Sequence, residues 1–296
     1  MRSSSHQAGG SRTPAGPQGP EPERHPGGGF GKLFIVSLGP GDPQYLAPAA
    51  RAALEAARVI VGYKTYIDLL DPALLKGKET LSTGMTGEIK RCRAAAASCS
   101  EGRDTAIVSS GDAGIYGMAG LALEILEEEG LTGKVDVEVV PGIPALAAAA
   151  ALLGAPLMHD FAVVSLSDLL TPWNAIQRRI EAAASADFVL VIYNPRSRKR
   201  HWQLEEAVRL MRARRSARTP VGLVRSAARD GQSVVITTLA DLPVDRVDML
   251  SILVIGNSST RVLGGRMVTP RGYLAKYGQT ASEESRSGFR TDAHSD

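Results

Sequence analysis

Small and polar residues follow four apolar runs of the chain, and their types suit ligand binding better than core packing. The segments are Gly39–Pro43, Ser110–Gly117, Pro141–Ala145 and Asn194–Ser197. Open α/β sheets bind ligands beyond the carboxyl ends of their strands, and glycine there lets a ligand approach the backbone closely. Each segment alone is also typical of a tight turn. Together, at four predicted strand ends, they predict one ligand cleft.

The first segment narrows the class of ligand. It lacks the third glycine of a dinucleotide-binding loop, because Gln44 stands there, and it lacks the Lys-Ser/Thr pair of a P-loop. A dinucleotide or a nucleoside triphosphate is therefore disfavoured. A nucleoside without phosphates is still compatible with the loop, and S-adenosylmethionine (SAM) is the common one.

Alternating strand and helix patterns predict an α/β fold with two lobes, each a mixed, mostly parallel sheet flanked by helices. The predicted strands are Leu33–Leu38, Arg58–Gly62, Thr105–Ser109, Val135–Val140, Ala162–Leu166, Phe188–Tyr193, Val221–Arg225, Ser233–Thr238 and Ile252–Ile255. The predicted helices are Ala47–Ala57, Glu88–Glu101, Ile115–Glu129, Ala145–Leu153, Trp173–Ser185 and Leu204–Arg214.

The lobes are expected to span residues 30–157 and 158–273. Residues 1–29 are rich in Gly, Pro and Ser and predict a disordered leader, and residues 274–296 predict a polar tail.

Composition excludes several classes of protein. No apolar run is long enough to span a bilayer, so no membrane partner is expected. The two cysteines, Cys92 and Cys99, have no CxxC spacing and no nearby histidine, so neither a metal site nor a disulfide framework is predicted, and a cytoplasmic location is expected. Residues 196–229 carry eleven Lys and Arg against two Glu. Only His201 and Trp202 are interleaved with them, which argues against nucleic-acid binding.

Many separate motifs resemble one known family. The first three loops resemble those of the tetrapyrrole methylase superfamily. Motifs further along the chain, in the same order, resemble the precorrin-3B C17-methyltransferases of cobalamin biosynthesis. These are Val61–Tyr63, Thr83–Met85, Gly117–Gly120, Gly154–Phe161, Ser165–Trp173, Tyr193–Ser197, Ile255–Ser258 and Thr269–Tyr273. The resemblance covers about residues 32–273.

This resemblance implies a two-lobed fold, usually a homodimer, with SAM between the lobes. It implies methylation of C17 of a corrinoid precursor, with ring contraction from precorrin-3B to precorrin-4. The positions that match cofactor contacts are Pro40, Ser110, Gly111, Asp112, Ile115, Pro144, Ala145, Leu166, Asn194 and Ala227. Pro144 is a departure, because many relatives have Thr there and its hydroxyl is missing. Asp112 could equally brace its loop.

Ring contraction needs a base and an acid. The candidates at predicted strand or loop ends are His159, Ser165, Ser167 and Asp168. His159 also fits a structural role, and Ser167 or Asp168 could simply cap a helix. A corrinoid precursor carries carboxylates, which arginine binds in bidentate geometry. The candidates for substrate binding are Arg196, Arg198, Arg225 and Arg271. Arg209, Arg212, Arg214 and Arg215 are expected to coat an exposed helix.

Alternatives stay open at this stage. The same chemistry can act on a cobalt-containing ring, as in the anaerobic pathway, or at another ring position. A different class is a non-catalytic protein that binds an anionic ligand or a nucleic acid. The sequence does not settle the metal state of the substrate.

Overall fold

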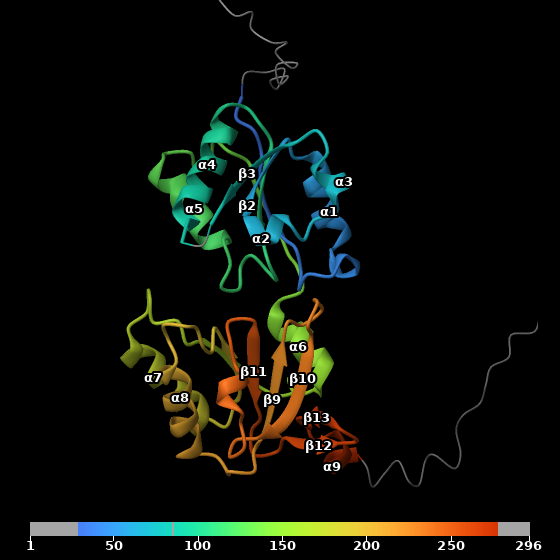
Figure 1. Cartoon of the computed structure of the whole chain (residues 1–296), viewed down its shortest axis with the longest axis vertical. Coiled ribbons are helices and arrows are strands. Elements are labelled where there is room, and N and C mark those ends of the chain that lie inside the picture. Colours follow the sequence, from blue (N-terminus) through green and yellow to red (C-terminus); the bar gives the residue numbers. More distant parts are fainter. Residues whose placement is uncertain (1–28, 85, 278–296) are drawn as a thin grey trace, which may run out of the picture.

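A computed structural model describes residues 29–84 and 86–277. They form two lobes, one above the other in Figure 1, each built on a five-stranded sheet. Most of the leader and the tail predicted for residues 1–29 and 274–296 lies outside the described residues; residues 274–277 belong to a short helix, α9 (Tyr273–Tyr277). Among the described residues, no helix combines the length and apolar character needed to cross a membrane.

The N-terminal sheet is entirely parallel, in the order β3-β2-β4-β1-β5. Its strands are β1 (Leu33–Ser37), β2 (Val59–Tyr63), β3 (Glu79–Thr83), β4 (Thr105–Ser109) and β5 (Val137–Val140). Its helices are α1 (Pro48–Ala56), α2 (Lys64–Ile67), α3 (Pro72–Leu75), α4 (Glu88–Ser100) and α5 (Ala119–Glu128), with a 3-10 turn η1 (Pro43–Tyr45).

Helices cover both faces of this sheet, α1 and α3 on one side and α4 and α5 on the other (Figure 1). Successive side chains of a strand point to opposite faces. In β1, Leu33 and Ile35 therefore pack in the cluster of α4 and α5, whereas Phe34 and Val36 pack in that of α1. Burial on both faces explains why these strands are continuous apolar runs.

Strand β3 was not predicted. It pairs with β2 at the edge of the sheet, and most of its residues are exposed or half-buried. An edge strand of this kind has no apolar run to reveal it.

The C-terminal sheet has the order β10-β9-β11-β8-β7 and is mixed. Its strands are β7 (Phe161–Ser165), β8 (Val189–Tyr193), β9 (Pro220–Arg225), β10 (Ser233–Thr238) and β11 (Ser251–Ile255). Only β7 and β8 are parallel neighbours; the other three pairs are antiparallel. The predicted mixed sheet is confirmed in this lobe, where antiparallel pairs outnumber parallel ones, one of them because the short connection 226–232 turns β9 directly into β10.

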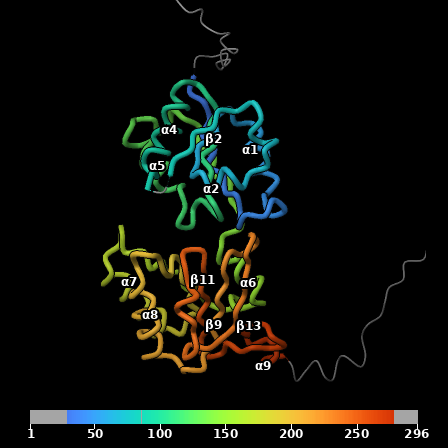
Figure 2. Tube along the Cα trace, viewed as in Figure 1, coloured from blue at the N-terminus to red at the C-terminus, as the bar shows by residue number. Residues whose placement is uncertain are grey.

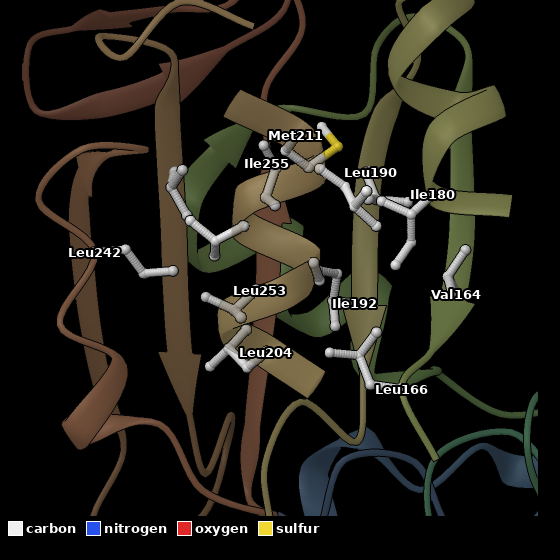
Figure 3. Packing of buried hydrophobic residues seen from close by; sticks show 14 of the residues in the cluster. Val164, Leu166, Ile180, Leu190, Ile192, Leu204, Met211, Leu242, Leu253 and Ile255 are labelled. Carbon is white, nitrogen blue, oxygen red and sulfur yellow. The ribbon is translucent and has the colours of Figure 1, made fainter. Parts of the chain in front are cut away.

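Helices again cover both faces of the C-terminal sheet. Helices α7 (Trp173–Ser185) and α8 (Trp202–Arg212) pack on one face over a cluster that includes Leu190, Ile192 and Leu253 (Figure 3). A 3-10 turn, η2 (Val244–Arg246), lies before β11. Helix α6 (Ala145–Leu153) packs on the other face.

The lobes are joined just before α6, where the trace passes from one to the other (Figure 2). Because Ala149 and Leu153 of α6 pack against the C-terminal sheet, we propose a lobe boundary at 141–144 instead of 157. Strand β6 (Gly154–Ala155) follows the helix directly. It forms a small sheet with β12 (Arg261–Leu263) and β13 (Arg266–Val268).

Candidate functional site

The first two loops are joined backbone to backbone where β1 and β4 end. The N–H of Gly39 donates to the carbonyl of Gly111 (3.0 Å), and the N–H of Gly111 donates to the carbonyl of Gly39 (2.7 Å). Both glycines have positive φ, 69° and 68°, a region that other residues rarely adopt. A Cβ on Gly39 would also lie 2.9 Å from the carbonyl oxygen of Tyr45. Glycine is therefore required for this junction.

Asp112 ties the second loop to the third. Its Oδ1 accepts from the N–H of Gly114 (2.8 Å), and its Oδ2 accepts from the N–H of Gly142 (3.0 Å). The buried hydroxyl of Ser37 accepts from the N–H of Ala113 (2.8 Å). In the structure, the Asp112 carboxylate therefore braces its loop, which is the second role considered for it. Together with the bonds between Gly39 and Gly111, this brace joins the three loops into one unit.

The third loop leads into α6. The N-cap residue of this helix is Pro144, whose side chain accepts no hydrogen bond from the helix. The hydroxyl of Tyr193, at the end of β8, accepts instead from the N–H of Leu146 (2.9 Å). It thus fills part of the role that the hydroxyl of a capping Thr would have. Burial raises the pKa of Tyr193, so this hydroxyl stays protonated at neutral pH.

The second loop lies close to the first turn of α6, because the residues at this contact are small. A Cβ built on Gly111 would lie 3.7 Å from both the nitrogen of Ala145 and the Cα of Pro144. It would occupy the space between the second loop and the helix. The predicted cofactor positions Gly111, Pro144 and Ala145 thus lie next to one another.

The C-terminal lobe contributes side chains to the facing edge. Asn194, at φ 48°, donates through Nδ2 to the hydroxyl of Ser165 (2.9 Å), which also accepts from the N–H of Ser167 (3.2 Å). Asp168 accepts at Oδ2 from Nε2 of Gln203 (2.8 Å). Neither Ser167 nor Asp168 caps α7, because Pro172 is its N-cap. The capping alternative is therefore wrong, and these polar groups lie together after β7 and β8.

His159 and Arg271 lie elsewhere in the chain's fold. They line a pocket with Phe161 and Phe188, where β7 and β8 begin. Ser165 is at the other end of β7, about 13 Å away at the usual rise per residue. The structure does not bring the proposed catalytic His159 or the proposed substrate-binding Arg271 to the cleft within one chain.

Three other arginine candidates differ in their freedom to bind a carboxylate. Arg225 is already paired through Nε with Asp248 (2.9 Å), and Arg196 donates to the carbonyl of Val244 (2.6 Å). Burial opposes ionisation of Asp248, but hydrogen bonds from Arg225 and neighbouring groups lower its pKa overall. Arg198 is exposed. Arg198 is therefore the most accessible of these candidates.

Two further expectations need correction. Arg215 does not coat an exposed helix: α8 ends before it, and its buried guanidinium pairs with Asp187. Leu166 is a poor cofactor contact, because its side chain is fully buried, its N–H donates to Tyr193 and its carbonyl accepts from Arg200. Ile115 remains accessible at 37% exposure.

One residue at the cleft was not predicted, and that is Arg229, after β9. Its Nε donates to the carbonyl of Pro40, and its Nη2 donates to the hydroxyl of Ser110 (2.5 Å). It comes two residues after Ala227, a predicted cofactor position. The sequence does not distinguish it from the other arginines of the basic segment 196–229. A cleft of about 920 Å³ opens beside it, lined by Pro40, Gly41, Asp42, Pro43, Gln44, Tyr45, Asp68, Leu69, Ile143, Ala147, Ala148, Ala151, Leu152, Ala228, Arg229, Asp230 and Gln232.

Comparison with known proteins gives the same family by three routes. Residues 32–243 match the family of tetrapyrrole (corrin/porphyrin) methylases. A probable cobalt-factor III C(17)-methyltransferase of Salmonella typhimurium strain LT2 is 50% identical over 241 residues, which is 81% of this chain and 99% of that protein. A cobalt-factor III methyltransferase of Priestia megaterium is 48% identical over 256 residues, 86% of this chain. The chain spans 47% of the length of the Priestia protein.

Among solved structures, the methyltransferase CobJ superposes with a TM-score of 0.78 at 34% identity. The match covers 81% of this chain and the whole of that one. The two-lobed α/β fold expected from the sequence is therefore confirmed.

Proposed function

The chain belongs to the tetrapyrrole (corrin/porphyrin) methylases, which use SAM as methyl donor, and from this premise we propose that it methylates C17 of a corrinoid precursor in cobalamin biosynthesis. One observation carries the proposal. The glycine-rich, backbone-lined edge of one sheet faces a side-chain-rich edge of the other, and predicted cofactor positions lie on both. A small donor and a large polar acceptor need surfaces of these two kinds.

The residues present fit SAM. Gly111 faces the start of α6 across backbone and small side chains, and a Cβ at position 111 would contact Pro144 and Ala145. Pro40, Ser110, Gly111, Asp112, Pro144, Ala145, Asn194 and Ala227 would hold the donor, with Ile115 at the rim. When bound, SAM supplies an activated methyl group. The chain's own contribution is to orient the acceptor carbon and exclude water, which can lower a barrier by roughly 7–11 kcal/mol in favourable cases.

Polar groups after β7 are proposed to serve the acceptor ring. Asp168 is ionisable and held at a fixed place by Gln203, so it can accept or return a proton at a ring substituent. The hydroxyl of Ser165, held by Asn194, can position a peripheral group. Arg198 is placed to pair with substrate carboxylates, and Arg196 and Arg225 could do so through the guanidinium N–H groups that do not bind Val244 and Asp248. We assign no role in this cleft to His159 or Arg271.

The metal state of the ring is the finer question. The resemblance of the motifs leads to metal-free precorrin-3B and ring contraction to precorrin-4. The two relatives that are about half identical are both named for cobalt-factor III, which favours a cobalt-containing substrate for this chain. We therefore propose cobalt-factor III as the first substrate to test and precorrin-3B as the second.

The test offers the purified full chain each ring in turn, with SAM carrying a ¹³C-methyl group. Mass spectrometry reports addition of one methyl, carbon NMR reports its position, and the absorption spectrum reports ring contraction. Label at C17 of one ring selects that substrate. Label at another position would overturn the C17 assignment. SAM binding without turnover of either ring would favour a non-catalytic binding protein.

The family resemblance also leads us to propose a homodimer in the cytoplasm. Sedimentation equilibrium of the full chain measures the dimer, and a monomer at micromolar concentration would contradict it.

A further inference from the structure

Arg229 joins the C-terminal lobe to two loops of the N-terminal lobe at once. Its Nε reaches the carbonyl of Pro40 in the first loop, and its Nη2 reaches the hydroxyl of Ser110 in the second. Hydrogen bonds from a charged guanidinium are stronger than neutral ones, and the side chain is half-buried, so water competes only partly for it. One side chain thus holds both loops in relation to β9.

Gly41 makes room for this side chain. A Cβ built on Gly41 would lie 2.5 Å from Nε of Arg229 and 2.8 Å from its Cγ. Gly41 also has φ 137°, which other residues rarely adopt. The first loop is therefore shaped around the arginine, and any side chain at position 41 would displace it.

The turn that carries Arg229 is held in an uncommon conformation. Ser226 and Ala228 both have positive φ, 50° and 54°. The N–H of Arg229 donates to the carbonyl of Ser226 (3.0 Å), and Oε1 of Gln232 accepts from the N–H of Ala228 (2.7 Å). Such a conformation costs free energy and persists only where the surroundings fix it. The turn therefore presents Arg229 and Ala227, two residues before it, as one rigid feature.

We propose that Arg229 is a positioning residue that fixes the turn after β9 onto both cofactor loops and so sets the width of the SAM cleft. The inference rests on the proposed placement of SAM at these loops. Without the guanidinium, Pro40 and Ser110 lose these two hydrogen bonds to the C-terminal lobe. SAM would then have to order the two lobes as it binds, and that ordering weakens its affinity.

Calorimetric binding of SAM to the full chain tests this without any corrinoid. We expect Arg229→Ala to raise the dissociation constant about tenfold, with Arg229→Lys between the two because an ammonium keeps the charge but lacks the planar fork that spans the two acceptors. Arg212→Ala is the matched control. Its guanidinium also donates to backbone carbonyls, those of Leu239 and Ala240, but within one lobe, so its affinity for SAM should equal that of the wild type.

Gly41→Ala supplies a second, independent variant. It should weaken SAM binding by itself, and combining it with Arg229→Ala should add little, because both changes break the same contact. Equal affinity of Arg229→Ala and the wild type, tighter binding by Arg229→Ala, or full additivity of the two changes would each overturn the proposal. A wild-type chain that binds SAM yet methylates neither ring contradicts the proposed substrate and leaves this result readable.

Discussion

The two sheet edges that face each other in this protein present different groups, mainly backbone on one edge and side chains on the other. The N-terminal edge is mostly backbone: Gly39 and Gly111 bond to each other, and Asp112 accepts from two further N–H groups. The C-terminal edge is side chain: Ser165 with Asn194, and Asp168 with Gln203. Backbone groups suit a ligand of constant shape, whereas side chains suit a substrate whose chemistry must be selected. On the proposed placement of SAM, most donor contacts lie on the first edge and two, Asn194 and Ala227, on the second, which also carries the groups proposed to serve the acceptor.

The largest expected effect is on SAM affinity and comes from a change at the backbone edge. Ala145→Trp should abolish SAM binding, because an indole there fills the gap against Gly111. Calorimetry measures the loss, and circular dichroism checks that the fold is kept. Leu123→Trp, at an exposed position of α5, is the control and should bind SAM normally. Normal affinity in Ala145→Trp would place the donor elsewhere.

The next effect belongs to the side-chain edge alone. Gln203→Leu removes the donor that fixes Asp168, so kcat should fall by about ten- to a hundredfold while SAM affinity stays the same. Thermal stability should hold or rise, because the buried Oε1 of Gln203 has no partner among the described residues. Steady-state kinetics and a melting curve separate the two quantities. A parallel loss of SAM affinity would show that the two edges are not independent.

A smaller effect is expected in the brace of the loops. Asp112→Ala leaves the N–H groups of Gly114 and Gly142 without their present acceptor and should lower the free energy of unfolding by about 2 kcal/mol. Denaturant unfolding measures it. Because the brace shapes the donor site, SAM affinity should fall as well. Lost affinity with unchanged stability would instead indicate that Asp112 contacts the donor directly.

The smallest effect concerns the helix that carries Ala145. Tyr193→Phe removes the acceptor for the N–H of Leu146 and should cost about 1 kcal/mol of stability. Tyr116 is a matched control, since its ring centroid lies 5.1 Å from that of Tyr193 and its hydroxyl donates a longer bond, 3.3 Å, to the carbonyl of Val163. Tyr116→Phe should cost less. Equal costs would mean that the bond to the N–H of Leu146 stabilises the helix start no more than the longer bond of Tyr116 stabilises its own loop.

The sequence by itself determined the strands that are buried on both faces, the four loops at their ends and the family. Apolar runs and glycine loops are local signals, readable without knowing what they pack against. The sequence did not reveal β3, because this strand lies at the edge of the sheet, is largely exposed and therefore has no apolar run. It left the C-terminal sheet open between mixed and mostly parallel, because strand direction there depends on which strand the turn at 226–232 leads into.

Only the tertiary structure decided which polar residues share the cleft. His159 and Ser165 are six positions apart in the chain, yet they lie at opposite ends of β7, whereas Arg229 comes from 189 positions away to meet Pro40. The same holds for Tyr193, which caps α6 in place of a hydroxyl that the sequence lacks at Pro144. Spacing along the chain does not report such contacts, because they arise from how the two sheets face each other.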